Sequence, residues 1–140
     1  CEELVLLSGD GRRYPELDLP ELADAVPDCG PLGGLVAAMR HGGDRAVLLL
    51  PVDMAGLTAA GLTALAEGFR AGGGPVVARG PDRRHPALSI WPASACSLLE
   101  TALAAGRLAL HPLLDQLEAR ELELPAEALI NWNRPEDMRR

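Results

Sequence analysis

Short apolar runs along the chain alternate with longer stretches in which apolar residues recur at helical spacing. Leu4–Leu7 and Ala46–Leu50 are continuous apolar runs, and each is followed by turn residues, Ser8-Gly9-Asp10-Gly11 and Pro51-Val52-Asp53. A continuous run is typical of a strand that is covered on both faces. We therefore predict a buried strand at Leu4–Leu7 and a central parallel strand at Ala46–Leu50.

Helical spacing predicts four helices in the body of the chain and a fifth near its end. The predicted spans are Leu32–Arg40, about Thr58–Ala71, Ser94–Ala105, Leu108–Glu118, and a last helix that begins at Pro135. We expect Thr58 to cap the second helix, because a threonine oxygen can accept from a free N–H group of the first turn. The Gly72-Gly73-Gly74 run should end that helix.

Three further strands are expected at Pro75–Arg79, at Pro86–Trp91 and, at the edge of a sheet, at Glu121–Leu124. The stretch between Gly11 and Cys29 is rich in loop residues. Strands that alternate with helices indicate an α/β domain with a mostly parallel sheet, and the region after residue 80 can add antiparallel pairs. A length of 140 residues with 48% hydrophobic content fits one packed domain.

The composition of the chain excludes some classes of binding partner. The net charge of −7 argues against nucleic acid, because binding to a polyanion depends on basic contacts to phosphate. No apolar run approaches the roughly 20 residues that span a bilayer, and no leader segment opens the chain, so we expect a cytoplasmic protein with no membrane partner. Cys1, Cys29 and Cys96 lack metal-ligand spacing and are expected to be free thiols.

Asp53 is the first candidate for chemistry. It follows an apolar strand directly, and in open α/β sheets ligands bind outside the carboxyl ends of the strands. A carboxylate at that place can hold Mg²⁺, which prefers hard oxygen ligands and keeps several waters. The structural alternative is that Asp53 caps a turn or the following helix.

Four motifs occur in the order and spacing of a known enzyme family. They are Asp24 ahead of Gly30-Pro31-Leu32-Gly33-Gly34, then Leu49-Leu50-Pro51-Val52-Asp53, then His85-Pro86-Ala87-Leu88, and finally Asn131-Trp132-Asn133-Arg134-Pro135-Glu136. The ordered set resembles the MobA-type molybdenum cofactor guanylyltransferases over essentially the whole chain. Ala105-Gly106-Arg107 also resembles a Gly-x-Arg segment of this family.

The resemblance implies a fold and an activity. The fold would be the Rossmann-like α/β fold of nucleotide-diphospho-sugar transferases, a mostly parallel sheet with helices on both faces, of which residues 1–140 form the C-terminal part of a single domain. The activity would be Mg²⁺-dependent transfer of GMP from GTP to molybdopterin with release of pyrophosphate. Other molybdenum cofactor synthesis proteins and molybdoenzyme chaperones would be partners.

The resemblance also assigns roles to residues. Asp53 would bind the metal and act in catalysis with Asn131 and Asn133, and Asp24 would accept the N1–H and N2–H groups of guanine. Gly30, Pro31, Leu32 and Gly34 would lie along the nucleotide, and Arg107 would meet the pterin phosphate. The structural alternatives are a solvated loop aspartate at Asp24, a turn at the asparagines and a surface arginine at Arg107.

The chain departs from the family pattern in one large respect. Family members begin with a glycine-rich loop of the form LAGGxSxRMGxDK, and neither this loop nor any lysine occurs among the residues. We therefore expect that the polypeptide continues upstream of Cys1 and that the 140 residues alone do not catalyse the transfer. Ser8-Gly9-Asp10 also replaces an asparagine-containing turn that can touch the nucleotide, and Val52 stands where cysteine is common.

Two other readings remain open at this stage. One is a sister enzyme, such as a molybdopterin cytidylyltransferase or a sugar-phosphate nucleotidyltransferase. The other is a noncatalytic remnant or binding module, a reading that the absent loop supports.

Overall fold

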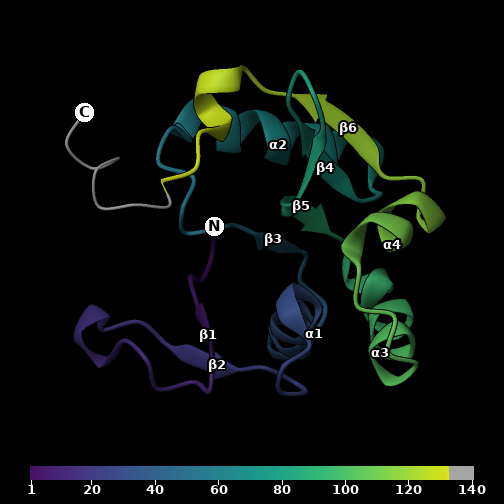
Figure 1. The fold of residues 1–140 in the computed structure, drawn as a ribbon. Helices are drawn as coiled ribbons and strands as arrows, with labels where there is room; N and C mark the ends of the chain where they lie inside the picture. The colour runs from purple at the N-terminus through teal and green to yellow at the C-terminus, as the bar shows by residue number, and fades with distance from the viewer. Residues whose placement is uncertain (133–140) are drawn as a thin grey trace. The chain divides into compact units, whose positions relative to one another are not determined.

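The computed structural model describes residues 1–132, in which helices and strands alternate along the chain (Figure 1). The strands are β1 (Leu6–Gly9), β2 (Glu21–Ala23), β3 (Val47–Leu49), β4 (Val76–Arg79), β5 (Arg84–Trp91) and β6 (Arg120–Glu123). The helices are α1 (Gly30–Gly42), α2 (Ala59–Gly72), α3 (Cys96–Ala104) and α4 (Leu110–Gln116), with short 3-10 turns at Pro15–Leu17, Ala93–Ala95 and Ala126–Leu129. This succession confirms the predicted α/β class, and the expected helix from Pro135 lies outside the described residues.

The described chain divides into two compact units. The first joins Cys1–Val47 with Pro92–Leu113, and the second joins Leu48–Trp91 with the chain from Leu114 onward. Of the helices within residues 1–132, none combines the length and the hydrophobicity that crossing a lipid bilayer requires.

In the first unit, α1 packs against the parallel pair of β1 and β2 and against α3. Pairing aligns Leu6 with Glu21 and Leu7 with Leu22. The core is made of fully or nearly buried side chains from the two helices: Leu32, Leu35, Val36, Met39, Leu99, Ala102 and Leu103. The loop-rich interpretation was wrong for Glu21–Ala23, because a strand this short carries too little periodicity and forms through its pairing with β1.

The predicted helix at Leu32–Arg40 is confirmed as α1, which is longer by two residues at each end. Pro31 lies in its first turn, where a missing N–H group has no intrahelical partner to lose. At the other end the Gly43 N–H donates to the Met39 carbonyl at 3.0 Å.

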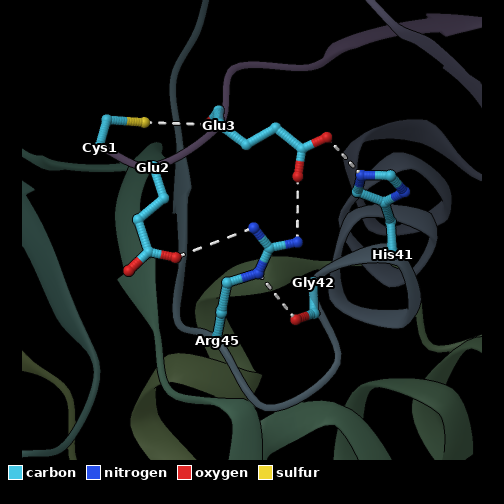
Figure 2. A network of polar contacts seen from close by, with 6 residues as sticks. All are labelled: Cys1, Glu2, Glu3, His41, Gly42 and Arg45. Atoms are coloured by element: carbon cyan, nitrogen blue, oxygen red, sulfur yellow. Dashed lines mark hydrogen bonds and ion pairs between the residues drawn. The ribbon is translucent and has the colours of Figure 1, made fainter.

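The N-terminal residues are held at the end of α1 by a polar network, which Figure 2 shows. The Glu3 carboxylate lies 2.8 Å from His41 Nε2 and accepts a hydrogen bond from Arg45 Nη2 at 3.0 Å. Glu2 lies 3.9 Å from the same arginine, whose Nε donates to the Gly42 carbonyl. The hydrogen bond with His41 and then that with Arg45 lower the pKa of Glu3.

In the second unit the strands follow the order β3-β5-β4-β6. β4 pairs with β5 in antiparallel fashion and with β6 in parallel, which confirms both the antiparallel contribution after residue 80 and the edge position of the last strand. α2 runs along β4, β5 and β6 (Figure 1). The core between them consists of Met54, Leu65, Val76, Ala78, Leu88, Ile90, Leu124, Ala128 and Leu129.

The ends of α2 follow the sequence expectation. Thr58 caps it, since its hydroxyl oxygen accepts from the Gly61 N–H at 3.2 Å, and Gly73 ends it with a left-handed φ of 69°.

Trp91 was expected in the core or a pocket wall, and it is fully buried in the structure. Its Nε1–H donates to the Ser89 hydroxyl at 2.8 Å. The three cysteines are free thiols, as expected.

The prediction of a buried, central strand at Ala46–Leu50 was wrong in both respects. β3 is the terminal strand of the described sheet, and Leu48 and Leu50 remain 38% and 41% exposed, whereas Leu49 is buried. A strand with one paired neighbour covers its faces unequally, although its apolar sequence is the same as that of a central strand.

Candidate functional site

Asp24 follows β2 directly and lies against the first turns of α1. Its N–H donates to the Gly9 carbonyl at 2.8 Å, which ties it to the end of β1. A Cβ atom placed on Gly34 would approach Asp24 Oδ1 to 3.2 Å, and one on Gly33 would approach the Val26 carbonyl to 2.9 Å. The structure therefore brings Asp24 and the glycine segment together, as the sequence indicated.

The other residues of that segment lie in different surroundings. Gly30 and Pro31 are exposed at the start of α1, whereas Leu32 is fully buried in the core. Gly30 has a left-handed φ of 57°, and nothing would meet a side chain built there within 4 Å. Gly30 and Pro31 are thus open to solvent, whereas the buried Leu32 side chain anchors the start of the helix in the core.

Opposing influences act on the Asp24 carboxylate. Partial burial raises its pKa, the nearby Arg13 guanidinium lowers it, and Asp28 raises it further. Burial is the largest of these causes, so the net shift is upward.

One carboxylate that sequence reasoning missed organises the loop after β1, residues 10–14, which we name the β1 loop. Glu21 accepts hydrogen bonds from the Ser8 hydroxyl at 2.5 Å and from the N–H groups of Arg13 and Tyr14 at 2.8 and 3.0 Å. These bonds, that of Ser8 first, lower the pKa of Glu21. The glycines of the turn were a signal for a tight loop, but nothing in the spacing pointed to Glu21 as its anchor.

Arg107 lies just after α3, and its side chain is exposed. Its N–H donates to the Ala102 carbonyl at 2.9 Å, and the Gly106 N–H donates to the Leu103 carbonyl at 3.1 Å. With a φ of 69° at Gly106, these two bonds form a Schellman cap. The Ala105-Gly106-Arg107 motif therefore has a structural explanation, and the Arg107 guanidinium is exposed to solvent at the helix end.

In the second unit, Asp53 and Asn131 come from distant parts of the sequence and lie on neighbouring segments. The Trp132 N–H donates to the Asp53 carbonyl at 2.8 Å, and Met54 forms an antiparallel bridge with Asn131. A Cβ atom on Gly56 would collide with the carbonyl oxygen of Glu127. The two predicted motifs are thus joined by backbone contacts, and Gly56 lets the segments approach.

Asn131 also carries an unusual side-chain atom. Its Oδ1 is buried without a hydrogen-bond partner among the described residues. Because buried carbonyl oxygens usually accept a hydrogen bond or bind a cation, this atom is a candidate ligand-binding group. Asn133, the second predicted asparagine, lies outside the described residues.

The side-chain types of Asp53 and Asn131, whose segments are joined by backbone contacts, fit a hard cation held partly by substrate. Asp53 and Asn131 offer a carboxylate and an amide oxygen, the ligand types that Mg²⁺ takes. Within residues 1–132 no group of three or more His, Cys, Asp or Glu side chains forms a metal cage. Mg²⁺ commonly binds through one or two protein ligands with water and substrate phosphates, so such a cage is not required.

In an α/β fold, a carboxylate that follows a strand, as Asp53 follows β3, lies where such folds bind their ligands. Residues 1–121 match the family description "MobA-like NTP transferase domain", and the chain belongs to that family.

Relatives of the chain include proteins named as molybdenum cofactor guanylyltransferases. A probable enzyme of this name from Opitutus terrae is 32% identical over 98% of the chain and 72% of its own length. The molybdenum cofactor guanylyltransferase of Serratia proteamaculans is 32% identical over 89% of the chain and 64% of its own length. The chain thus spans between about two thirds and three quarters of these relatives.

Solved structures share the fold. A protein of Aquifex aeolicus superposes with a TM-score of 0.84 at 20% identity, over 95% of this chain and 72% of that one. Molybdopterin-guanine dinucleotide biosynthesis protein A from Archaeoglobus fulgidus gives a TM-score of 0.61 at 24% identity, over 79% of this chain and 60% of that one. These likenesses show a shared fold and, together with the family match, support the nucleotide-diphospho-sugar transferase type of fold expected from the sequence.

Proposed function

We propose that the chain supplies the catalytic carboxylate and the base-recognition residues of a molybdenum cofactor guanylyltransferase, which transfers GMP from GTP to molybdopterin. The observation that carries the proposal is the meeting of Asp53 with Asn131, two motifs that are far apart in the sequence and adjacent in the fold. The names of the relatives supply the substrates.

The reaction is an in-line displacement at phosphorus. A terminal phosphate oxygen of molybdopterin forms a bond to the α-phosphorus of GTP, the bond from that phosphorus to the bridging oxygen of the β-phosphate breaks, and pyrophosphate leaves with the electron pair. Such a step needs positioning and charge neutralisation more than covalent help from the protein.

Asp53 and Asn131 are the residues that would hold Mg²⁺. When bound, the ion would neutralise charge on the phosphate oxygens and orient them. Within residues 1–132, it is the backbone carbonyl of Asp53 that accepts the bonds from Trp132 and Ala55, so these bonds do not occupy its carboxylate. Asn133 and Arg107 are proposed, on family likeness alone, to assist at the pterin phosphate.

Asp24 is proposed to select guanine. Guanine presents two adjacent donors, N1–H and N2–H, that a carboxylate can accept together, and adenine lacks this pair. Exposed Gly30 and Pro31, with Gly34 against the Asp24 carboxylate, leave room for a base or ribose beside it.

The test is release of pyrophosphate from GTP in the presence of molybdopterin and Mg²⁺, with CTP as the competing nucleotide. In a polypeptide that also carries the glycine-rich loop of the family ahead of these residues, we expect turnover with GTP and at least tenfold less with CTP, about the discrimination that one missing paired contact gives. Preference for CTP would assign the chain to the cytidylyl branch, and binding of neither nucleotide would make it a noncatalytic relative.

A further inference from the structure

The two tryptophans of the chain have different surroundings. Trp91 is fully buried, whereas Trp132 is 41% exposed. Phe69 is partly buried against the core, so Trp132 is the exposed aromatic side chain among the described residues of the second unit. An indole in contact with water offers a wide flat face to a ligand, and covering that face with another ring is favourable.

The backbone of Trp132 is tied to the carboxylate-bearing residue of the proposed site. Its N–H donates to the Asp53 carbonyl at 2.8 Å, and the neighbouring bridge pairs Met54 with Asn131 in antiparallel fashion. In that register Asp53 stands opposite Trp132. Residues that stand opposite one another in an antiparallel pair have neighbouring side chains. The indole is therefore attached beside the residue that is proposed to hold Mg²⁺.

The exposed side chains next to this pair are apolar. Val52, directly before Asp53, is 92% exposed, and Ile130, two residues before Trp132, is 52% exposed. Asp53 itself is half-buried. These two joined segments thus combine one carboxylate with exposed apolar surface. A matching ligand has a phosphate, which Mg²⁺ can join to the carboxylate, and a flat ring that covers the apolar surface.

The acceptor of the proposed reaction has both parts. Its terminal phosphate must reach the metal to attack GTP, and its pterin contains a flat pyrimidine ring, which stacks on an aromatic face as nucleobases do. We propose that the indole of Trp132 is the stacking platform for the pterin ring, and that Trp132 thereby helps to select the acceptor. This inference rests on the proposed function, because it assumes that the acceptor phosphate is held at Asp53.

The test measures binding by titration calorimetry with Mg²⁺, in a polypeptide that also carries the glycine-rich loop of the family ahead of these residues. The ligand is 6-hydroxymethylpterin monophosphate, which has the ring and a phosphate, and glycerol 3-phosphate is the ligand without the ring. The variants are Trp132→Leu and Trp132→Phe. Tyr14→Leu is the matched control, because Tyr14 is also 41% exposed but belongs to the first unit.

For Trp132→Leu we expect a loss of about tenfold in affinity for the pterin phosphate, the size of one stacking contact, and no change for glycerol phosphate. Trp132→Phe keeps an aromatic face and should stay within about threefold of the wild type. Tyr14→Leu should match the wild type. As a second readout, acrylamide quenches the emission of exposed tryptophan, and bound pterin phosphate should reduce this quenching, whereas glycerol phosphate should not.

The results that would overturn the inference are distinct from those that would overturn the proposed function. Equal losses for both ligands in Trp132→Leu would show that the indole only supports the phosphate site. Unchanged pterin affinity in that variant, with reduced self-association by light scattering, would identify a second copy of the chain as the occupant. Unchanged affinity in a wild type that prefers GTP to CTP rejects the inference alone, whereas a wild type that binds neither GTP nor the pterin phosphate rejects the proposed function.

Discussion

The backbone of Asp53 is fixed by hydrogen bonds that do not involve its carboxylate. Because the backbone carbonyl bonds to Trp132 and Ala55, Asp53→Asn should keep the fold while it removes the charge that a cation needs. In a polypeptide that also carries the glycine-rich loop of the family, we expect a loss of roughly a hundredfold or more in GTP turnover, since charge stabilisation by a metal contributes several kcal/mol. Pyrophosphate release and the Mg²⁺ affinity of the GTP-bound protein measure the effect.

Asp82→Asn is the matched control for that prediction, since it makes the same chemical change on the exposed turn between β4 and β5 of the same unit. It should leave turnover and Tm at wild-type values. Activity of Asp53→Asn within a few-fold of wild type would remove Asp53 from the reaction.

At Gly56 the backbone lies directly against the backbone carbonyl of Glu127. A methyl group there would collide with the Glu127 carbonyl, and a backbone atom cannot move aside as the end of a flexible side chain can. Gly56→Ala should therefore destabilise the protein by about 1–3 kcal/mol, as overpacking does. Chemical denaturation would measure it.

The control for Gly56 is Gly74→Ala, where nothing lies within 4 Å of the added carbon. That change should stay within about 0.5 kcal/mol of wild type, as most substitutions in open space do. Equal losses for the two variants would show that chain flexibility, and not the collision, sets the cost.

The sequence predicted the positions of some residues of the structure and missed the role of others. The placement of Asp53 after an apolar run and of Thr58 before a helix followed from local rules that involve only nearby residues. Glu21 was missed because its three donors come from Ser8, Arg13 and Tyr14, which are brought to it by the pairing of β1 with β2. Periodicity along the sequence cannot predict a contact that depends on the pairing of two strands.

At the scale of elements, the N-terminal segment is fastened to the end of α1 by groups that titrate. The pKa of Glu3 is lower in the folded protein than its ordinary value of 4.5. Its stabilising contribution is therefore complete above the unfolded pKa and is lost as pH falls through the folded one. Glu3→Gln should lower Tm at neutral pH, and its Tm should converge with that of the wild type in acid.

A series of thermal melts from neutral to acid pH would show this convergence. Glu2→Gln is the control, because the Glu2 carboxylate lies 3.9 Å from Arg45 and its side chain is 82% exposed. It should change Tm less than Glu3→Gln does. A constant gap between wild type and Glu3→Gln at every pH would contradict the ionic explanation.

The sequence predicted the helices better than it predicted the order of the strands in the sheet. Helices α1 and α2 were found from spacing and end signals, because a helix satisfies its own backbone groups and its amphipathic pattern is local. The position of β3 was not found, since an apolar run at Ala46–Leu50 looks the same whether its strand has one neighbour or two. Strand order is a property of the sheet and not of any one segment.

On the scale of the whole molecule, an acidic surface coexists with an apolar strand at the end of the described sheet. Leu48 in β3 is 38% exposed, and Leu50 and Val52, which follow the strand, are 41% and 92% exposed. A net charge of −7 repels copies at neutral pH, and this repulsion vanishes near the pI of about 4.9. Exposed apolar strands at a sheet edge then favour association.

We expect Leu48→Arg to reduce self-association near that pH, as measured by light scattering, because a charge on an edge strand opposes pairing with a second copy. Leu108→Arg adds the same charge at a residue of comparable exposure, 36%, in the loop between α3 and α4. Equal reductions in both variants would show that net charge alone, and not β3, governs association.

The bridge between Met54 and Asn131 has a consequence for biosynthesis. Ribosomes deliver a chain from its N-terminus, so a nascent polypeptide that has reached β6 already carries Asp53 but not yet the segment that fixes it. Contacts between such distant residues form late, because the intervening loop must close first. Asp53 therefore acquires its fixed setting only after Asn131 and Trp132 have left the exit tunnel, and a truncated translation product would hold an unformed site.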